Sequence, residues 1–310
     1  MVDLSIVTTL YYSENELNEF HVRATRAASE ITEDFEIVYV NDGCPQQSLQ
    51  IAREFLRTEP RTVVVDLSRN FGHHRAMMTG LQQSVGRHVF MIDSDLEEQP
   101  ELLHDYWRAL STTPNADSVY GIQGSRKGAF FERVSGRIWY LIFALLSSVQ
   151  YPANGVTARL MTRRYVDALL QFSETELELW GIFVLVGFEQ KELLVIKGSK
   201  GTSTYSLRKK ISIAVNSITS FSSAPLKGMF LFGSLITAGS FLFVIYLIGS
   251  KLLFNSIIAG WTSTLASIWL IGGLIIFSIG LVGIYLSKIF LEIKRRPLTI
   301  IRKVYRADDQ

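Results

Sequence analysis

Short apolar runs alternate with amphipathic segments over the N-terminal part of the chain. Runs rich in β-branched residues predict strands at residues 4–10, 35–40, 62–67, 88–92 and 118–122. Helical spacing predicts helices between them: one opened by Ser13, which has capping-box spacing to Glu16, then about 48–57, 74–84, and from Pro100 onward. This alternation predicts an α/β domain with a mostly parallel sheet and helices on both faces.

The pattern becomes less regular after Gly124. Residues 130–148 predict an apolar core or interface helix, because Glu132, Arg133 and Arg137 argue against a membrane span. Residues 191–197 predict a short strand, and 198–206 a polar loop. Residues 211–225 mix apolar with Ser, Thr and Asn side chains, which is typical of a helix lying in a membrane interface.

Two long apolar runs follow, at residues 229–248 and 264–286, and neither contains Asp, Glu, Lys, Arg or His. Each is close to the ~20 residues that a helix needs to cross the apolar core of a bilayer. The runs predict a two-helix membrane hairpin. The chain then divides into a head (1–206), a juxtamembrane amphipathic segment (207–228), the hairpin (229–287) and a basic C-terminal tail (288–310).

Basic residues flank the two apolar runs, although the formal net charge is only +2. They are Arg208, Lys209, Lys210 and Lys227 before the first run, and Lys288, Lys294, Arg295, Arg296, Arg302, Lys303 and Arg306 after the second. The loop between the runs, residues 249–263, carries only Lys251. By the positive-inside rule both flanks and the head are cytoplasmic, which predicts a multi-pass protein of the inner membrane.

Charge and cysteine content exclude some classes of protein. The near-neutral chain does not indicate a nucleic-acid-binding protein. Cys44 is the only cysteine, so an intramolecular disulfide and a cysteine-rich metal site are excluded. The polar N-terminus predicts no signal peptide.

Two carboxylates separated by one residue, Asp93 and Asp95, follow the predicted strand 88–92. Ligands of parallel sheets bind at the carboxyl ends of the strands, and a carboxylate pair there can face one hard cation. Mg²⁺ or Mn²⁺ would leave room for phosphate oxygens. The alternative is a solvated acidic turn, because further glutamates follow.

Asp42 follows another predicted strand and precedes Gly43, so its carboxylate could accept hydrogen bonds from a nucleobase or a ribose. A turn aspartate that bonds its own backbone is the alternative. His73 and His74 are adjacent at a helix start, where side chains diverge, so a shared metal is not expected.

Several motifs taken together are more specific than any of them alone. They are residues 5–11 with Glu14 and Leu17, 40–43 (Val-Asn-Asp-Gly), 68–72 (Ser-Arg-Asn-Phe-Gly) with Ala76 and Gly80, 93–96 (Asp-Ser-Asp-Leu) with Pro100 and Glu101, 201–205 (Gly-Thr-Ser-Thr-Tyr), and 283–297 (Gly-Ile-Tyr to Lys-Arg-Arg-Pro). In this order they resemble the membrane-anchored polyprenyl-phosphate branch of glycosyltransferase family 2, relatives of dolichol-phosphate-mannose synthase. The resemblance covers nearly the whole chain.

The resemblance implies a GT-A-type head, a nucleotide-diphospho-sugar donor, a divalent metal (Mg²⁺ or Mn²⁺) and inversion at the sugar carbon. It also implies a polyprenyl phosphate acceptor, such as undecaprenyl phosphate, and a product used in envelope or O-antigen glycan modification. A homo-oligomer is expected. Asp95 and Asp93 are the implied metal ligands and, with Arg159, the implied catalytic residues. The implied donor- and acceptor-binding residues are Thr9, Tyr11, Glu14, Asn41, Asp42, Asn70, Lys200, Ser203, Tyr205 and Arg208.

The chain departs from the family's pattern at Asn41, where Asp is usual, at Thr204, where Lys is usual, and at Thr157. Many relatives carry at the position of Thr157 an Asp proposed as the base. A sugar hydroxyl has a very high pKa and needs a general base. A phosphate monoester, whose second pKa is roughly 6, is already largely ionised at neutral pH. Thr157 is therefore compatible with a lipid-phosphate acceptor.

Two other functions stay open on the sequence. One is a transferase of the same fold that acts on a hydroxyl of a lipid-linked sugar, with Glu97 or Glu98 as the base. The other is a catalytically degenerate membrane protein that binds lipid or partners.

Overall fold

The computed structural model describes residues 2–123, 154–174, 178–195, 224–254 and 260–307. The chain forms two compact units. Of the described residues, those up to Val195 and from Arg296 onward belong to an α/β unit, and those of 224–254 and 260–295 belong to a helical unit. The predicted segments 130–148 and 198–206, and most of 211–225, lie outside the described residues.

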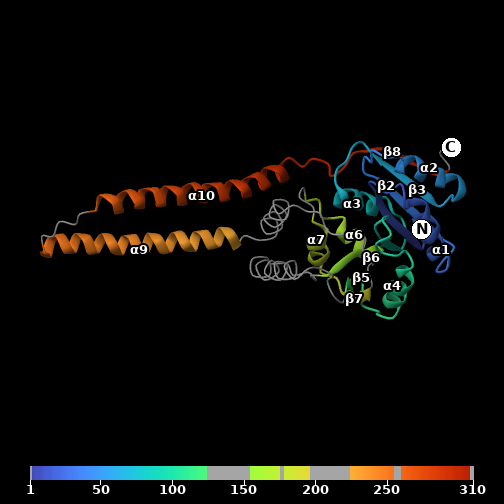
Figure 1. Ribbon diagram of the computed structural model, residues 1–310. Helices are drawn as coiled ribbons and strands as arrows, with labels where there is room; N and C mark the ends of the chain where they lie inside the picture. Colours follow the sequence, from blue (N-terminus) through green and yellow to red (C-terminus); the bar gives the residue numbers. More distant parts are fainter. Residues whose placement is uncertain (1, 124–153, 175–177, 196–223, 255–259, 308–310) are drawn as a thin grey trace. The chain divides into compact units, whose positions relative to one another are not determined.

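The described residues of the α/β unit form an eight-stranded sheet with the order β7-β5-β6-β4-β1-β2-β3-β8 (Figure 1). The strands are β1 (Leu4–Leu10), β2 (Phe35–Asn41), β3 (Thr62–Leu67), β4 (His88–Met91), β5 (Ser118–Gln123), β6 (Gly155–Thr162), β7 (Gln190–Val195) and β8 (Ile301–Tyr305). β1 pairs in parallel with β2 and β4, whereas β6 and β8 run antiparallel to their neighbours. The prediction of a mostly parallel sheet is confirmed.

Helices cover both faces of this sheet. One layer consists of α1 (Leu17–Ser29), α2 (Ser48–Thr58) and α4 (Leu102–Ser111), and the other of α3 (His73–Gln83), α6 (Arg163–Leu169) and α7 (Leu179–Leu185). Successive side chains of a strand point to opposite faces, so Ile6 packs in the α1 layer and Val7 in the α3 layer. The central strands are apolar on both faces because both are covered.

The capping box predicted at Ser13 is wrong. α1 begins at Leu17, and Glu16 precedes it without a side-chain cap bond. The Ser13 hydroxyl instead lies 2.9 Å from the Ser94 hydroxyl. The Ser13 side chain, which the local sequence pattern assigns to a helix cap, is used in a tertiary contact.

The C-terminal residues depart from the predicted organisation. In place of a basic tail from residue 288, α10 (Trp261–Ile293) continues the helical unit, and β8 pairs with β3 at the sheet edge. Val304 packs in the α3 layer, and Arg302 forms a 3.0 Å ion pair with the buried Asp66. The local pattern did not reveal β8 because its stability comes from a partner strand far away in the sequence.

The helical unit contains both predicted apolar runs, within α9 (Ala224–Phe254) and α10. Among the described residues, one helix segment, Ile271–Ile293, is long and apolar enough to cross a membrane, with a mean hydropathy of 2.2. Pro225–Ile236 at the start of α9 is a shorter apolar segment. The two helices run in opposite directions within this unit (Figure 1).

Candidate active site

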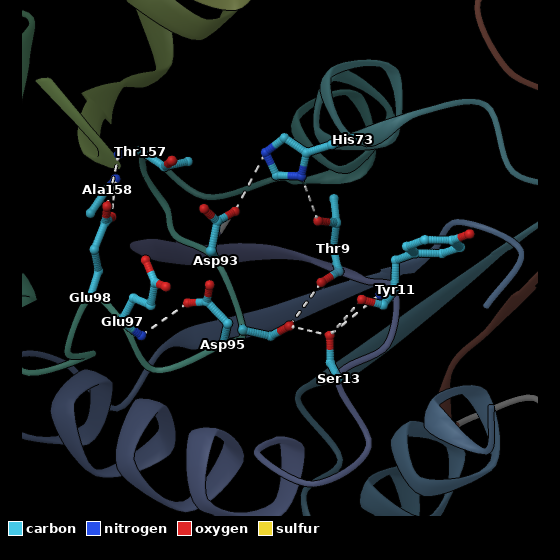
Figure 2. A network of polar contacts seen from close by, with 11 residues as sticks. Thr9, Tyr11, Ser13, His73, Asp93, Asp95, Glu97, Glu98, Thr157 and Ala158 are labelled. Carbon is cyan, nitrogen blue, oxygen red and sulfur yellow. Dashed lines mark hydrogen bonds and ion pairs between the residues drawn. The ribbon is translucent and has the colours of Figure 1, made fainter. Parts of the chain in front are cut away.

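The carboxyl ends of the central strands bring together several of the implied site residues, among them Thr9, Tyr11, Asp93 and Asp95 (Figure 2). β1 lies between β4 and β2, so the turns that follow these three strands meet at one edge of the sheet. Thr9 lies in β1 and Tyr11 directly follows it, Asn41 ends β2 and Asp42 follows it, and the Asp93–Asp95 turn comes after β4.

The turn after β4 is pinned to β1 by the residue between the two carboxylates. Ser94 is buried, and its hydroxyl donates to the Thr9 carbonyl (2.9 Å) and lies 2.9 Å from the Ser13 hydroxyl. Asp93 and Asp95 on either side are only half-buried. Asp95 Oδ1 also accepts the Glu97 amide at 2.9 Å, and Leu96 between them has φ of +60°. The pair is therefore held in a tight turn with both carboxylates partly open.

His73 connects this carboxylate pair to β1. Its Nε2 lies 3.5 Å from Asp93 Oδ1, and its Nδ1 lies 3.1 Å from the Thr9 hydroxyl. Desolvation and the neighbouring His74 lower the pKa of His73 to about 4, although its side chain is 43% exposed and Asp42 and Asp95 oppose the shift, so the ring is neutral at pH 7. A neutral ring that donates from Nε2 to Asp93 accepts the Thr9 hydroxyl proton at Nδ1. Sequence reasoning considered His73 only as a metal ligand and missed this positioning contact.

Asp42 has a backbone-binding role in the structure. The buried carboxylate accepts the amides of Phe71 (2.7 Å) and Gly72 (3.0 Å), which ties the end of β2 to the loop before α3. Gly43 has φ of +61°, and a Cβ there would lie 2.4 Å from the Asn70 nitrogen, so the two loops approach as closely as glycine allows. These bonds differ from the alternative of a turn aspartate that bonds its own backbone, because the Asp42 carboxylate binds amides of another loop.

The other implied donor-binding residues lie around the same edge. Asn41 is buried and donates to Asp66 at 2.8 Å, so its side chain stabilises the strand ends. Tyr11 is 47% exposed and stacks edge-to-face on Tyr12, whose φ of +59° is unusual for a tyrosine. Glu14 accepts the Gln47 amide at 3.1 Å. Of these residues, Tyr11 offers the most open side chain to a ligand.

Glu98 is occupied by backbone contacts. It is buried, and its two carboxylate oxygens accept the amides of Thr157 (3.0 Å) and Ala158 (2.5 Å) (Figure 2). The loop after β4 is thereby joined to β6, which pairs with β4 in the sheet. This use of both oxygens argues against the role of general base that the sequence left open for Glu98.

Arg159 is not brought to the carboxylate pair. Its guanidinium is buried, lies 4.0 Å from the centroid of the Phe183 ring, and donates to Gln190 at 2.5 Å. The residue sits on β6 opposite Met91, and its side chain enters the layer occupied by α7. The structure supports a packing role in place of the implied catalytic role, because a guanidinium that is 1% exposed does not reach a ligand at the strand ends.

The α/β unit, including this site, matches a known family. The family model described as glycosyl transferase family 2 matches residues 5–170, which is more than half of the chain. The chain belongs to glycosyl transferase family 2. The match runs from β1 to α6 and so contains the strand ends described above.

Similar proteins extend over nearly the whole chain. A protein of Mycobacterium tuberculosis (strain CDC 1551 / Oshkosh) with the name "Putative glycosyltransferases" is 47% identical over 305 residues, covering 98% of this chain and 89% of that protein. The uncharacterized glycosyltransferase YkcC of Bacillus subtilis (strain 168) is 30% identical over 310 residues, covering 98% and 94%. The SfII prophage-derived bactoprenol glucosyl transferase of Shigella flexneri is 28% identical over 312 residues, covering 98% and 99%.

The carboxylates of this family 2 glycosyltransferase fit a hard divalent cation that is shared with a ligand. Within the described residues, no group of three or more His, Cys, Asp or Glu side chains is arranged to hold a metal. The residues that the structure describes therefore supply no closed cage there. Mg²⁺ and Mn²⁺ sites of phosphate-bearing substrates commonly use one or two carboxylates and take their other ligands from phosphate and water. Asp93 and Asp95, half-buried on one turn, match that pattern.

The implied acceptor-binding residues Lys200, Ser203, Tyr205 and Arg208 lie outside the described residues. Thr157, at the position where relatives carry an Asp, is held at its amide by Glu98 and is half-buried. The sequence assigned no role at the site to Ser94 or His73. A serine between two aspartates and a histidine after Asn-Phe-Gly are the signals that could have found them.

Proposed function

We propose that this family 2 glycosyltransferase transfers a sugar from a nucleotide-diphospho-sugar to polyprenyl phosphate at the cytoplasmic face of the membrane, with inversion at the sugar carbon. The observation that carries the proposal is the Asp93–Asp95 turn, pinned by Ser94 to the end of β1 with both carboxylates partly open. A bactoprenol glucosyl transferase similar over 98% of this chain supports the acceptor class.

In the proposed reaction an oxygen of the acceptor phosphate attacks the anomeric carbon from the side opposite to the nucleotide. The bond between that carbon and the diphosphate oxygen breaks, and the nucleoside diphosphate leaves with the electron pair. Asp93 and Asp95 would hold a divalent cation, and His73, whose Nε2 lies 3.5 Å from Asp93 Oδ1, would orient Asp93. When bound, the cation offsets the charge that develops on the departing diphosphate.

The acceptor is proposed to be a phosphate because neither Thr157 nor Glu98 is available as the base that a hydroxyl needs, which leaves Glu97 as the carboxylate that a hydroxyl acceptor would have to use. Thr157 has no ionisable group, and the carboxylate that contacts it, Glu98, is committed to two backbone amides. A largely ionised phosphate monoester requires no proton transfer. Lys200, Ser203 and Arg208 are proposed to hold this phosphate, because a basic loop with a hydroxyl suits a phosphate group.

The position of β8 supports a membrane hairpin. β8 belongs to the same sheet as β1–β7, yet α9 and α10 lie between β7 and β8 in the sequence. Both ends of the intervening chain must then be on one side of any membrane, so the number of crossings must be even. Ile271–Ile293 qualifies as one span. We propose that α9, which contains the apolar run 229–248, supplies the other.

A two-step experiment tests the proposed function. Nucleotide-diphospho-sugars are first screened by thermal shift with Mg²⁺ or Mn²⁺ on the detergent-solubilised chain. The donor that stabilises the protein is then incubated with undecaprenyl phosphate. We expect a lipid-linked sugar that mild acid releases, as a glycosyl phosphodiester does. An acid-stable product indicates a hydroxyl acceptor, and donor binding without any transfer indicates a binding protein.

A further inference from the structure

A second concave surface lies between α2 and β8, which are neighbours at one edge of the α/β unit (Figure 1). It has a volume of about 630 Å³, and the cations that line it are Arg53, Arg57, Lys303 and Arg306. We call it the basic groove. β8 is three strands away from β1 in the sheet order, so the groove is separate from the candidate donor site.

The sequence spacing explains why these cations share one surface. Arg53 and Arg57 are four residues apart on α2 and therefore lie on the same helix face. On β8, alternate residues point to opposite sides. Lys303 and Tyr305 line the groove, whereas Arg302 pairs with Asp66 and Val304 packs in the core.

The charges of the basic groove are oriented but not neutralised. The Arg53 guanidinium lies 4.5 Å from the centroid of the Tyr305 ring, and the Lys303 ammonium 4.9 Å from it. A ring holds a cation without removing its charge or its hydrogen-bond donors. Among the described residues the four cations make no ion pair, and Glu54 is the carboxylate that lines the groove with them.

We propose that the basic groove binds a phosphate-bearing anion. Arginine forks match phosphate oxygens in a bidentate geometry, and two of them with a lysine beside them form a cationic surface for a phosphate or diphosphate. The volume is within the usual range of small-molecule sites. The source is either a soluble diphosphate or an anionic lipid head group, since residues 294–300 separate β8 from the candidate membrane helix α10.

The first arm of the test uses inorganic pyrophosphate and the full chain in detergent, with EDTA to exclude binding through a metal. Calorimetry compares the wild type, R53Q/R57Q, and the control R26Q/R108Q, which removes two exposed helix arginines elsewhere with the same charge change. We expect salt-sensitive binding that R53Q/R57Q weakens at least tenfold and the control leaves unchanged. No donor is present, so the result does not depend on the proposed transfer.

The second arm uses phosphatidylglycerol, with phosphatidylcholine as the uncharged comparison, and counts bound lipids by native mass spectrometry. Loss of a phosphatidylglycerol adduct in R53Q/R57Q but not in R26Q/R108Q identifies a lipid head group as the source. A D308N/D309N chain lacks the carboxylates that follow Arg306 in the sequence and should bind at least as tightly as the wild type. The proposal fails if R53Q/R57Q behaves like the control in both arms, or if D308N/D309N binds more weakly.

Discussion

At the scale of single residues, the Asp93–Asp95 turn shows how one small side chain determines what its neighbours can do. The Ser94 side chain is buried, and its hydroxyl is hydrogen-bonded to β1. The side chains on either side of it, Asp93 and Asp95, are only half-buried, so their carboxylates stay partly exposed to solvent. Without the hydrogen bonds of Ser94, the same three residues would form a solvated acidic turn, which is the alternative that the sequence left open. The carboxylate pair is a candidate site because its turn is anchored.

We expect D95A to abolish sugar transfer and metal-dependent donor binding while the unliganded chain keeps its unfolding temperature. Removing a charged ligand from a diphosphate–metal site costs several kcal/mol of transition-state stabilisation, roughly a hundredfold or more in rate. Thermal shift with donor and Mn²⁺ measures the loss. D105A, which removes an exposed carboxylate on α4, is the matched control. Near-normal turnover of D95A would refute the assignment.

We expect H73Q to raise the Mn²⁺ concentration needed for half-maximal donor binding by roughly three- to tenfold, since one polar contact contributes about 0.5–1.5 kcal/mol. Glutamine keeps hydrogen-bonding capacity but does not reproduce the link from Thr9 to Asp93. A metal titration at fixed donor concentration measures the shift. H104Q, which removes a histidine that contacts Glu30, should leave the titration unchanged. A fall in unfolding temperature without a shift in the titration would show that His73 contributes to stability and not to metal-dependent donor binding.

At the scale of elements, Glu98 joins the loop after β4 to β6 through two amides. We expect E98Q to lower the unfolding temperature, because one carbonyl oxygen replaces two carboxylate acceptors and leaves a buried amide unsatisfied at about 1–3 kcal/mol. Transfer, assayed well below the unfolding temperature, should fall only a few-fold. A loss of transfer by orders of magnitude at unchanged stability would instead make Glu98 a catalytic base.

The packing of α1 on α2 makes stability depend on pH through His21. The ring stacks on Phe55 at 3.9 Å between centroids, and its Nδ1 lies 2.9 Å from the Tyr39 hydroxyl. Burial lowers the pKa of His21 to about 4, although the nearby Glu59 opposes the shift. The folded ring is therefore neutral at pH values where the histidine of an unfolded chain, with a pKa near 6.5, takes up a proton.

Stability should consequently fall as the pH drops from about 6.5 toward 4, because the unfolded state binds more protons in that window. The full effect is up to about 3 kcal/mol, at about 1.4 kcal/mol per pKa unit. Unfolding temperatures of the wild type and H21Q, measured from pH 7 to 4.5, give the contribution of His21 as the difference between the two profiles. Parallel profiles would contradict the prediction.

At the scale of the whole molecule, the expected topology places the loop 249–263 outside the cytoplasm. In a C44S background, S256C should react with a membrane-impermeant thiol reagent in intact cells. D105C, on the α/β unit, should react only after permeabilisation. Both expectations follow from the charge asymmetry of the flanks and the even number of crossings that β8 requires. Labelling of S256C only in permeabilised cells would refute the topology.

The sequence by itself determined the strands β1–β5, the helices between them, both apolar runs and the location of the carboxylate pair. These features depend on local periodicity, and β-branched runs and ~20-residue apolar stretches have few alternatives. The family motifs added the chemistry that the spacing of single residues left ambiguous.

Only the tertiary structure decided which partners the polar side chains take. Ser13 joins Ser94 in place of a helix cap, Asp42 and Glu98 hold backbone amides of distant loops, and Arg159 is buried against α7. β8 likewise exists because β3 offers it an edge. Each of these outcomes depends on contacts between residues far apart in the chain. A buried polar group without a hydrogen-bond partner costs free energy, so it pairs with the partner that the tertiary packing brings close to it.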